Sequence, residues 1–166
     1  LRRVNQMACM KKREEARPRL ARYECHLLNH IASGAEVVPA NVMPKLVQVQ
    51  ANTEDELLFR YVCLHWSIPV SSGYGRRLRF LVKDQSNGKL IGLFGLADPV
   101  YALRARDQWI GWDAHVKRER LYHVMDAFVL GAVPPYSTLL CGKLVAMLAT
   151  SDTVRKAFRN RYGGRE

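Results

Sequence analysis

The chain has 166 residues, which suits one domain, and 48% of them are hydrophobic, enough to build a core and to exclude wholesale disorder. Its 26 Lys and Arg residues outnumber the 15 Asp and Glu residues, and the net charge of +11 attracts phosphate groups and other polyanions. No apolar run approaches the roughly 18 residues that a membrane span needs, so a membrane partner is not expected.

The cysteines are scattered along the chain, with no C-x-x-C pair. They are Cys9, Cys25, Cys63 and Cys141. A disulfide framework or a zinc cluster needs closely spaced ligands, so the spacing favours reduced, mostly buried thiols in a cytoplasmic protein.

Residues 1–33 are predicted to form a basic helical segment that precedes the main domain at 34–166. Apolar residues recur at spacings of three and four between Leu20 and Ile31, which places them on one helix face. Pro18 is expected to start a second helical piece, since proline fits a first turn and breaks a helix interior.

The next predicted elements are a short edge strand and a well-marked helix. Val47 and Val49 alternate with glutamines in an extended stretch, as an edge strand does. Thr53 and Glu56 form a capping box that begins a helix over 53–66.

A β-hairpin is predicted over 77–96, after a flexible Gly/Ser loop at 70–76. Its first strand alternates apolar and basic residues, so one face should be apolar and the other basic. Asn87-Gly88 supplies the turn, and two glycines in the return strand, Gly92 and Gly95, indicate a bulge or a close approach.

The remaining chain should contain two strands and three helices. We expect a short strand at 109–112, a basic helix at 114–123, a central strand at 124–133 covered on both faces, and two closing helices that end near residue 162. The fold class is therefore α+β, with a central antiparallel or mixed sheet and flanking helices.

An N-acyltransferase-like fold is one alternative for this order of elements. In that fold, glycines after the central strand bring backbone N–H groups to a pyrophosphate. Here the turn reads Pro134-Pro135, and proline has no N–H to donate. Acyl-CoA binding would also require a cleft between the strand at 124–133 and its neighbour.

Several blocks of sequence between Trp66 and Tyr162 resemble the DruA family of the bacterial Druantia anti-phage systems. They are Trp66-Ser67-Ile68-Pro69-Val70, Gly73-Tyr74-Gly75-Arg76-Arg77, Asn87-Gly88-Lys89-Leu90-Ile91-Gly92, Asp98-Pro99-Val100, Arg106-Asp107-Gln108-Trp109-Ile110-Gly111-Trp112, Asp126 to Tyr136, Gly142-Lys143-Leu144-Val145-Ala146 and Arg161-Tyr162-Gly163. The resemblance implies a bacterial, cytoplasmic protein of antiviral defence. It carries over no catalytic residues, and it implies a longer C-terminus, so the chain is expected to be a truncated member.

Arginines beside aromatic residues are the predicted contacts to nucleic acid. Guanidinium groups bind phosphates, and aromatic rings stack on unpaired bases. The candidates are Tyr74, Arg76, Arg77, Arg79, Arg104 and Arg106. Trp109 and Trp112 could join them, although at least one of the two is expected in the core.

A metal-dependent nuclease is an alternative function. Clustered carboxylates bind Mg²⁺, and a lysine can stabilise developing charge. The candidates are Asp98, Asp107, Asp113, Asp126 and Lys143. Asp98, Asp107 and Asp113 also have ordinary explanations, as a turn, an ion pair and a helix cap. Asp126 instead interrupts an apolar strand, where a buried carboxylate needs a partner. No cofactor is expected unless this alternative holds.

Two further alternatives remain open from the sequence. His26 and His30 share a helix face at i and i+4 and could bind a metal, but no third ligand is evident. The chain could also be a non-catalytic subunit that docks other defence proteins through an exposed apolar patch at its C-terminal edge.

Overall fold

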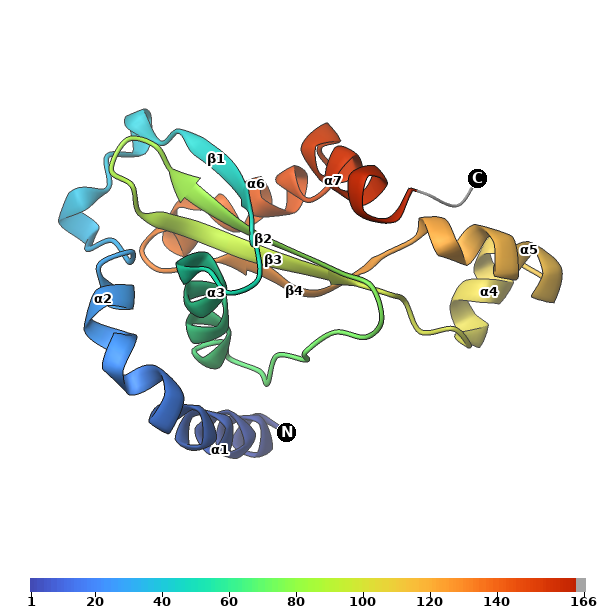
Figure 1. Ribbon diagram of the computed structural model, residues 1–166, viewed down its shortest axis with the longest axis horizontal. Coiled ribbons are helices and arrows are strands. Elements are labelled where there is room, and N and C mark those ends of the chain that lie inside the picture. The colour runs from blue at the N-terminus through green and yellow to red at the C-terminus, as the bar shows by residue number, and fades with distance from the viewer. Residues whose placement is uncertain (164–166) are drawn as a thin grey trace.

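A four-stranded antiparallel sheet forms the centre of the computed structural model, which describes residues 1–163 (Figure 1). Its order along the sheet is β1 (Pro44–Gln48), β2 (Arg77–Asp84), β3 (Leu90–Ala97) and β4 (Asp126–Ala132). Helices flank the sheet, which confirms the α+β class. None of the described helices is both long and apolar enough to cross a bilayer.

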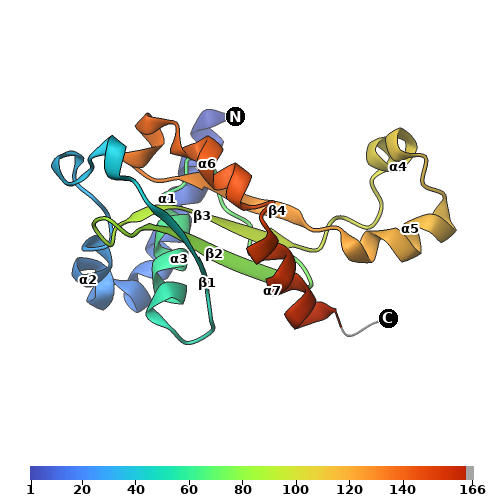
Figure 2. The same ribbon diagram turned by 90° about the horizontal axis from the view of Figure 1, so that it is seen from above.

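Helices cover both faces of the sheet (Figure 2). The sheet therefore separates two hydrophobic clusters, one on each face. One face packs on α6 (Cys141–Leu148) and α7 (Asp152–Tyr162), and the other packs on α2 (Glu24–Leu28) and α3 (Glu54–Leu64). Alternate residues of β2 enter different clusters, as the pleat requires: Phe80 faces α6, whereas Leu81 faces α3.

The predicted hairpin is confirmed as β2 and β3, which pair from Arg77↔Ala97 to Lys83↔Leu90. Both glycines of the return strand occupy crowded positions. A Cβ on Gly95 would lie 2.2 Å from the ring of Phe128, and one on Gly92 would lie 2.4 Å from a carbonyl oxygen of β4. A register shift after Gly95 supplies the expected bulge.

The basic face of the hairpin is covered at Arg79 and Lys83, while Arg77 at its start is exposed. Arg79 and Lys83 point to the first turn of α3, where Glu56 and Asp55 pair with them. The acidic N-terminus of α3 therefore neutralises the middle of β2.

The N-terminal segment is helical as predicted, but its break lies elsewhere. Helix α1 (Arg2–Leu20) contains Pro18 within its last turn, and a 3₁₀ turn at 21–23 separates it from α2. The expectation that Pro18 starts the second piece is wrong. Its missing N–H removes one hydrogen bond to the preceding turn, and the helix still continues for two residues beyond it.

The capping box of α3 is present in a modified form. Thr53 Oγ1 accepts from the N–H of Glu56 at 3.4 Å, but the Glu56 carboxylate accepts from the N–H of Asn52 at 2.8 Å rather than from Thr53. Both interactions satisfy free donors near the helix start.

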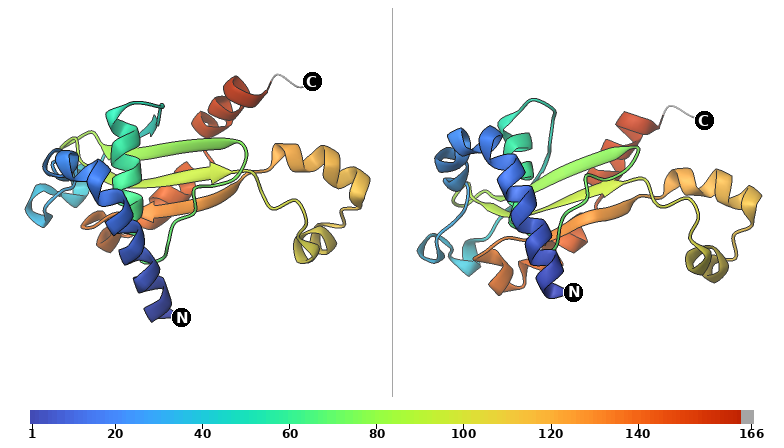
Figure 3. Two further views of the ribbon diagram at one scale, coloured as in Figure 1. Left: turned by 60° about the horizontal axis from the view of Figure 1, so that its bottom comes forward. Right: turned by 90° about the horizontal axis from the view of Figure 1, so that it is seen from below.

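The predicted strand at 109–112 is wrong, because these residues end a helix. Helix α4 (Arg104–Ile110) is closed by Gly111 in the left-handed conformation, and α5 (Ala114–Arg120) follows. The two helices project from one end of the sheet (Figures 1 and 3). The apolar residues of α4 therefore have no core to enter, and Trp109 is 91% exposed.

Strand β4 lies at an edge of the described sheet, not at its centre as its apolar sequence suggests. It is hydrogen-bonded to β3 from Asp126 to Ala132, so no cleft separates the two strands. The N-acyltransferase alternative consequently lacks the opening that it requires.

Candidate nucleic-acid interface

A cavity of about 810 Å³ lies where the sheet meets the projecting helices, and tyrosines and arginines line it. We call it the tyrosine pocket. Its lining residues are Tyr74, Arg76, Asp98, Pro99, Tyr101, Arg118, Leu121, Tyr122, Arg161 and Tyr162. They come from the segments just before β2 and just after β3, from α5 and the turn after it, and from the end of α7.

Arg76 is held at the base of this pocket by Asp98. The guanidinium Nε donates to Oδ1 of Asp98 at 2.6 Å, and the backbone N–H of Arg76 donates to Oδ2 at 2.9 Å. The guanidinium carbon lies 4.3 Å from the centre of the Tyr122 ring, with Phe158 and Tyr162 also within 6 Å. Nη1 is buried and has no hydrogen-bond partner among the described residues. The cation is therefore fixed mainly by one carboxylate and by aromatic faces.

The rim of the tyrosine pocket is exposed, unlike its base. Tyr74 is 79% exposed, and Tyr101 is also exposed. Arg118 and Arg161 are exposed at the same cavity and form no ion pair within residues 1–163. Exposed rings beside exposed guanidinium groups are the components that bind a base and its phosphate.

A second cavity, of about 680 Å³, lies between α1, α3 and the start of β2, and we call it the basic groove. Its basic lining residues are Lys12, Arg19, Arg22, Arg60, Arg77 and Arg79. The groove and the tyrosine pocket are joined by Tyr162, whose hydroxyl donates to the carbonyl of Arg77 and accepts from its N–H, each at 2.9 Å.

Glu56 neutralises part of the basic groove. Its Oε1 lies 3.0 Å from Nη2 of Arg79 and 3.3 Å from Nη2 of Arg60. Burial acts to raise the pKa of Glu56, but the N–H of Asn52 and the two arginines outweigh it and lower the pKa. Glu56 is thus ionised at neutral pH, and Arg79 is not free for a ligand, whereas Arg77 remains exposed.

Cys63 also lines the basic groove, but its environment disfavours a nucleophilic thiolate. Burial raises the pKa of this thiol to about 12, against the opposing effect of Arg79 and Lys12. The thiol therefore stays protonated at neutral pH, and it supplies packing rather than reactivity.

The two arginines predicted on residues 104–106 differ in their surroundings. Arg106 pairs with Asp107 at 2.8 Å and donates to the carbonyls of Val100 and Tyr101, so it shapes the loop before α4. Arg104 is exposed at the first turn of α4. Trp112 is half-buried beneath Arg106, so neither this tryptophan nor the exposed one of α4 lies in the core.

Three of the candidate aspartates each have a structural partner in the fold. Asp98 holds Arg76, Asp107 pairs with Arg106 and Lys117, and Asp113 caps α5 by accepting from the N–H of Val116 at 2.8 Å. The pKa of Asp107 is lowered first by Arg106 and then by Lys117.

The remaining nuclease candidates are Asp126 and Lys143, and Asp126 lies opposite Ala97, the residue before Asp98, in the pairing of β3 with β4. Asp126 is exposed at the first residue of β4, and Lys143 is exposed on α6. Within residues 1–163, none of the four aspartates belongs to a three-residue group that could hold a metal. The metal-dependent nuclease stays a prediction.

Exposed apolar side chains are not confined to the C-terminal edge. Leu140 and Met147 are exposed around α6, and Val100, Leu103, Trp109 and Ile110 are exposed on or beside α4. The docking of other defence proteins through such a patch stays a prediction.

The family model for Druantia protein DruA matches residues 1–166. The chain belongs to the DruA family. A curated relative, the Druantia protein DruA of Escherichia coli (strain UMEA 4076-1), is 53% identical over 137 residues. The match covers 82% of this chain and 34% of the relative, so the chain spans about a third of the relative's length. No solved structure matches the chain at a significant level.

Family membership confirms the resemblance drawn from the blocks between Trp66 and Tyr162, and it extends to the N-terminal helices. The sequence identified Tyr74 and Arg76, which do line one cavity. It missed Arg118, Arg161 and Tyr122, because these residues lie on distant elements whose approach depends on the tertiary fold. Only their residue types, arginine and tyrosine, could have indicated a contact to nucleic acid from the sequence.

Proposed function

We propose that this chain binds single-stranded nucleic acid as a component of a Druantia anti-phage defence system. Membership in the DruA family supports the defence role. The tyrosine pocket supports the ligand, and it is the observation on which the proposal depends: exposed Tyr74 and Tyr101 line the same cavity as the exposed Arg118 and Arg161.

In this proposal, stacking binds the bases and positive charge binds the phosphates. An unpaired base stacks on an exposed tyrosine ring, an interaction worth about 1–3 kcal/mol per base. The adjacent phosphates contact Arg118 and Arg161, while the fixed pair of Arg76 and Asp98 keeps the floor of the pocket rigid. A duplex hides its base faces, so single strands are the preferred class.

The basic groove extends the path for the phosphate backbone. Arg77 lies between the two cavities, and Arg19 and Arg22 of the N-terminal segment add exposed charge on the other side. Arg79, Arg76 and Arg106 have structural partners, so the proposal shifts the phosphate contacts from these three residues to Arg77 and to the exposed arginines of the two cavities.

The test is a titration of labelled single-stranded DNA, single-stranded RNA and duplex DNA at two salt concentrations. We expect single strands to bind more tightly than the duplex, and binding to weaken steeply with salt as counterions are released. Replacing Arg118 and Arg161 by alanine together should weaken binding at least ~10-fold and reduce the salt slope by about 0.7 for each phosphate that is no longer neutralised.

A matched control removes the same charge from another face. Arg155 and Lys156 are exposed on α7 and line none of the described cavities. The double change Arg155→Ala and Lys156→Ala should weaken binding far less than the pair in the pocket. Equal decreases in affinity for the two double variants would show non-specific charge attraction and contradict the proposed site.

A further inference from the structure

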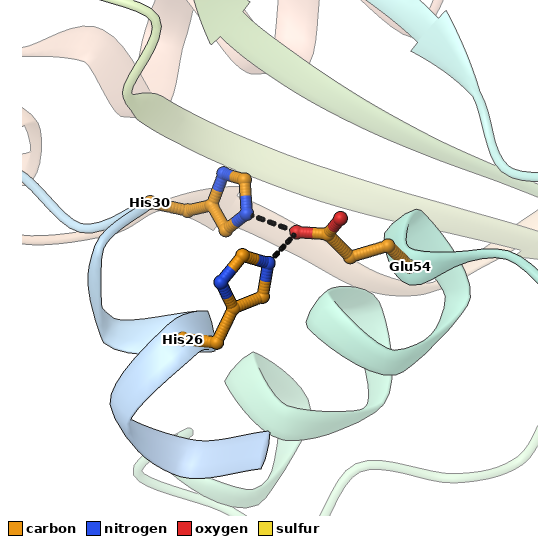
Figure 4. A group of neighbouring side chains, drawn as sticks. All are labelled: His26, His30 and Glu54. Carbon is orange, nitrogen blue, oxygen red and sulfur yellow. Dashed lines mark hydrogen bonds and ion pairs between the residues drawn. The ribbon is translucent and has the colours of Figure 1, made fainter.

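Two histidines from α2 and the turn after it meet a glutamate of α3 at one point on the surface (Figure 4). His26 lies on α2, His30 lies in the turn that follows it, and Glu54 is the first residue of α3. The Nε2 atoms of both imidazoles point to the same carboxylate oxygen, Oε1 of Glu54, at 2.9 Å for His26 and 2.5 Å for His30.

Contacts of the neighbouring backbone and core fix the segments that carry these three residues. The carbonyl of His30 accepts from the N–H of Leu90 at 2.7 Å, which fastens the turn to β3. Leu27 is buried beside it, and Thr53 caps the helix that begins at Glu54. The three side chains therefore converge because α2 and α3 are packed in place.

The ion pairs of Glu54 are with the two histidines, and the neighbouring acid has a different partner. The adjacent carboxylate, Asp55, pairs with Lys83 at 2.7 Å on the sheet side. Glu54 and His26 are about half or more exposed, and His30 is mostly covered. One side of the group therefore opens to water, and the other side rests on the protein.

We propose that His26, His30 and Glu54 form a binding site for a divalent transition-metal ion of the zinc class. Two imidazole nitrogens and one carboxylate oxygen are a preferred zinc donor set, with bonds of about 2.0–2.2 Å and a fourth position left for water. The three ligand atoms lie within 4.8 Å of one another. Tetrahedral ligands on one zinc are ~3.3 Å apart, so small side-chain rotations open the present contacts to the required spacing.

The ion would join the N-terminal helical segment to the body of the domain. The site takes ligands from α2, from the turn after it and from α3, and α2 and α3 are distant in sequence but packed together. A metal ion that binds the folded state but not the unfolded state stabilises the folded state by mass action. The expected effect is therefore a rise in thermal stability, independent of any nucleic-acid binding.

The test uses the whole chain after removal of metal with a chelator. Calorimetric titration with zinc chloride should give one site per chain, and zinc at 100 times its Kd should raise the Tm by several degrees. His26→Ala, His30→Ala and Glu54→Gln should each weaken zinc binding at least ~10-fold, because each removes one of three ligands.

His115→Ala is the matched control. His115 is exposed and lies 3.8 Å from Glu119 at i and i+4, so it is a histidine–glutamate pair without a second histidine. Zinc binding should be unchanged in this variant. If wild-type protein binds no zinc, or if the three site variants bind it as tightly as wild type does, the proposal is overturned.

A spectroscopic variant keeps the test decisive if an alanine variant folds poorly. In a Cys25→Ser background, which removes the exposed thiol next to His26, the variant His30→Cys should give a sulfur-to-cobalt charge-transfer band with Co²⁺. The same background with His30 intact should lack that band. Absence of the band in the folded His30→Cys variant would overturn the assignment of this position as a ligand.

Discussion

Arg76 and Asp98 join the start of β2 to the end of β3 through two contacts, one from the guanidinium at 2.6 Å and one from the backbone N–H at 2.9 Å. Such a bidentate arrangement uses both carboxylate oxygens and fixes the arginine among aromatic rings. An arginine that the sequence marks as a phosphate contact is thus part of the frame of the tyrosine pocket, and the exposed residues of its rim are the ones available to a ligand.

The Arg76–Asp98 contact depends on Gly75. Its φ of +60° is unfavourable for other residues, and a Cβ there would lie 2.1 Å from Oδ2 of Asp98. We expect Gly75→Ala to lower the free energy of unfolding by about 2–4 kcal/mol, the sum of backbone strain and a broken ion pair. Urea denaturation followed by circular dichroism measures it.

Gly88→Ala is the control for this prediction. Gly88 also has positive φ, at +74°, but a Cβ there meets nothing within 4 Å. It should cost only the strain of about 1 kcal/mol. Equal destabilisation in the two variants would show that the collision with Asp98 contributes nothing.

Asp84 should make stability depend on acid pH. Asp84 is 1% exposed, and burial alone would raise its pKa. Hydrogen bonds from the N–H groups of Met43 and Ser86 and from the hydroxyl of Tyr136 outweigh burial and lower the pKa. A lowered folded pKa adds stability that is present above the unfolded value of about 3.9 and is lost as pH falls through the folded pKa.

The variant Asp84→Asn tests this dependence. It should destabilise the domain at pH 7 by about 1–3 kcal/mol, because the N–H groups of Met43 and Ser86 lose a charged acceptor and the oxygen that accepts from the Tyr136 hydroxyl is replaced by an amide nitrogen. Its stability should change less than that of wild type between pH 5 and the acid limit. Asp152→Asn, at an exposed position, should leave both quantities near wild type. Parallel curves for Asp84→Asn and wild type would contradict the role assigned to this carboxylate.

Glu56 should restrain nucleic-acid binding while it stabilises the fold. Glu56→Gln keeps an acceptor for the N–H of Asn52 but removes the charge that pairs with Arg60 and Arg79. We expect stability to fall by about 1–2 kcal/mol, and affinity for single strands at low salt to rise several-fold because the basic groove gains net positive charge.

The proper comparison for Glu56→Gln is the removal of one acid elsewhere. Asp152→Asn changes the net charge equally but lies on α7 and pairs with Arg155. It should raise affinity only slightly. A decrease in affinity for Glu56→Gln would indicate that Arg79 needs its partner for correct placement, and it would contradict the restraining role of Glu56.

Local sequence signals predicted most of the elements, and tertiary contacts account for the differences. Alternation and Asn87-Gly88 predicted the hairpin, since both act within a few residues. The four residues from Trp109 to Trp112 favoured a strand, but so short an apolar run does not distinguish strand from helix, and Gly111 closes a helix instead.

The candidate site residues show the same division between local and tertiary signals. Spacing placed Arg77 and Arg79 on one strand face, but only the packing of α3 shows that Glu56 covers Arg79 and leaves Arg77 exposed. Spacing also paired His26 with His30, whereas their shared partner lies 24 residues beyond His30. Contacts over such sequence distances follow from the fold, which local periodicity does not specify.

Photo-cross-linking of a bound single-stranded oligonucleotide, with the modified residues mapped by mass spectrometry, tests most directly whether the tyrosine pocket binds unpaired bases. We expect adducts on Tyr74 and Tyr101, and we expect Tyr74→Ala to abolish the first adduct and to weaken binding. Adducts confined to residues outside the tyrosine pocket and the basic groove, with Tyr74→Ala binding as tightly as wild type, would contradict the proposed interface.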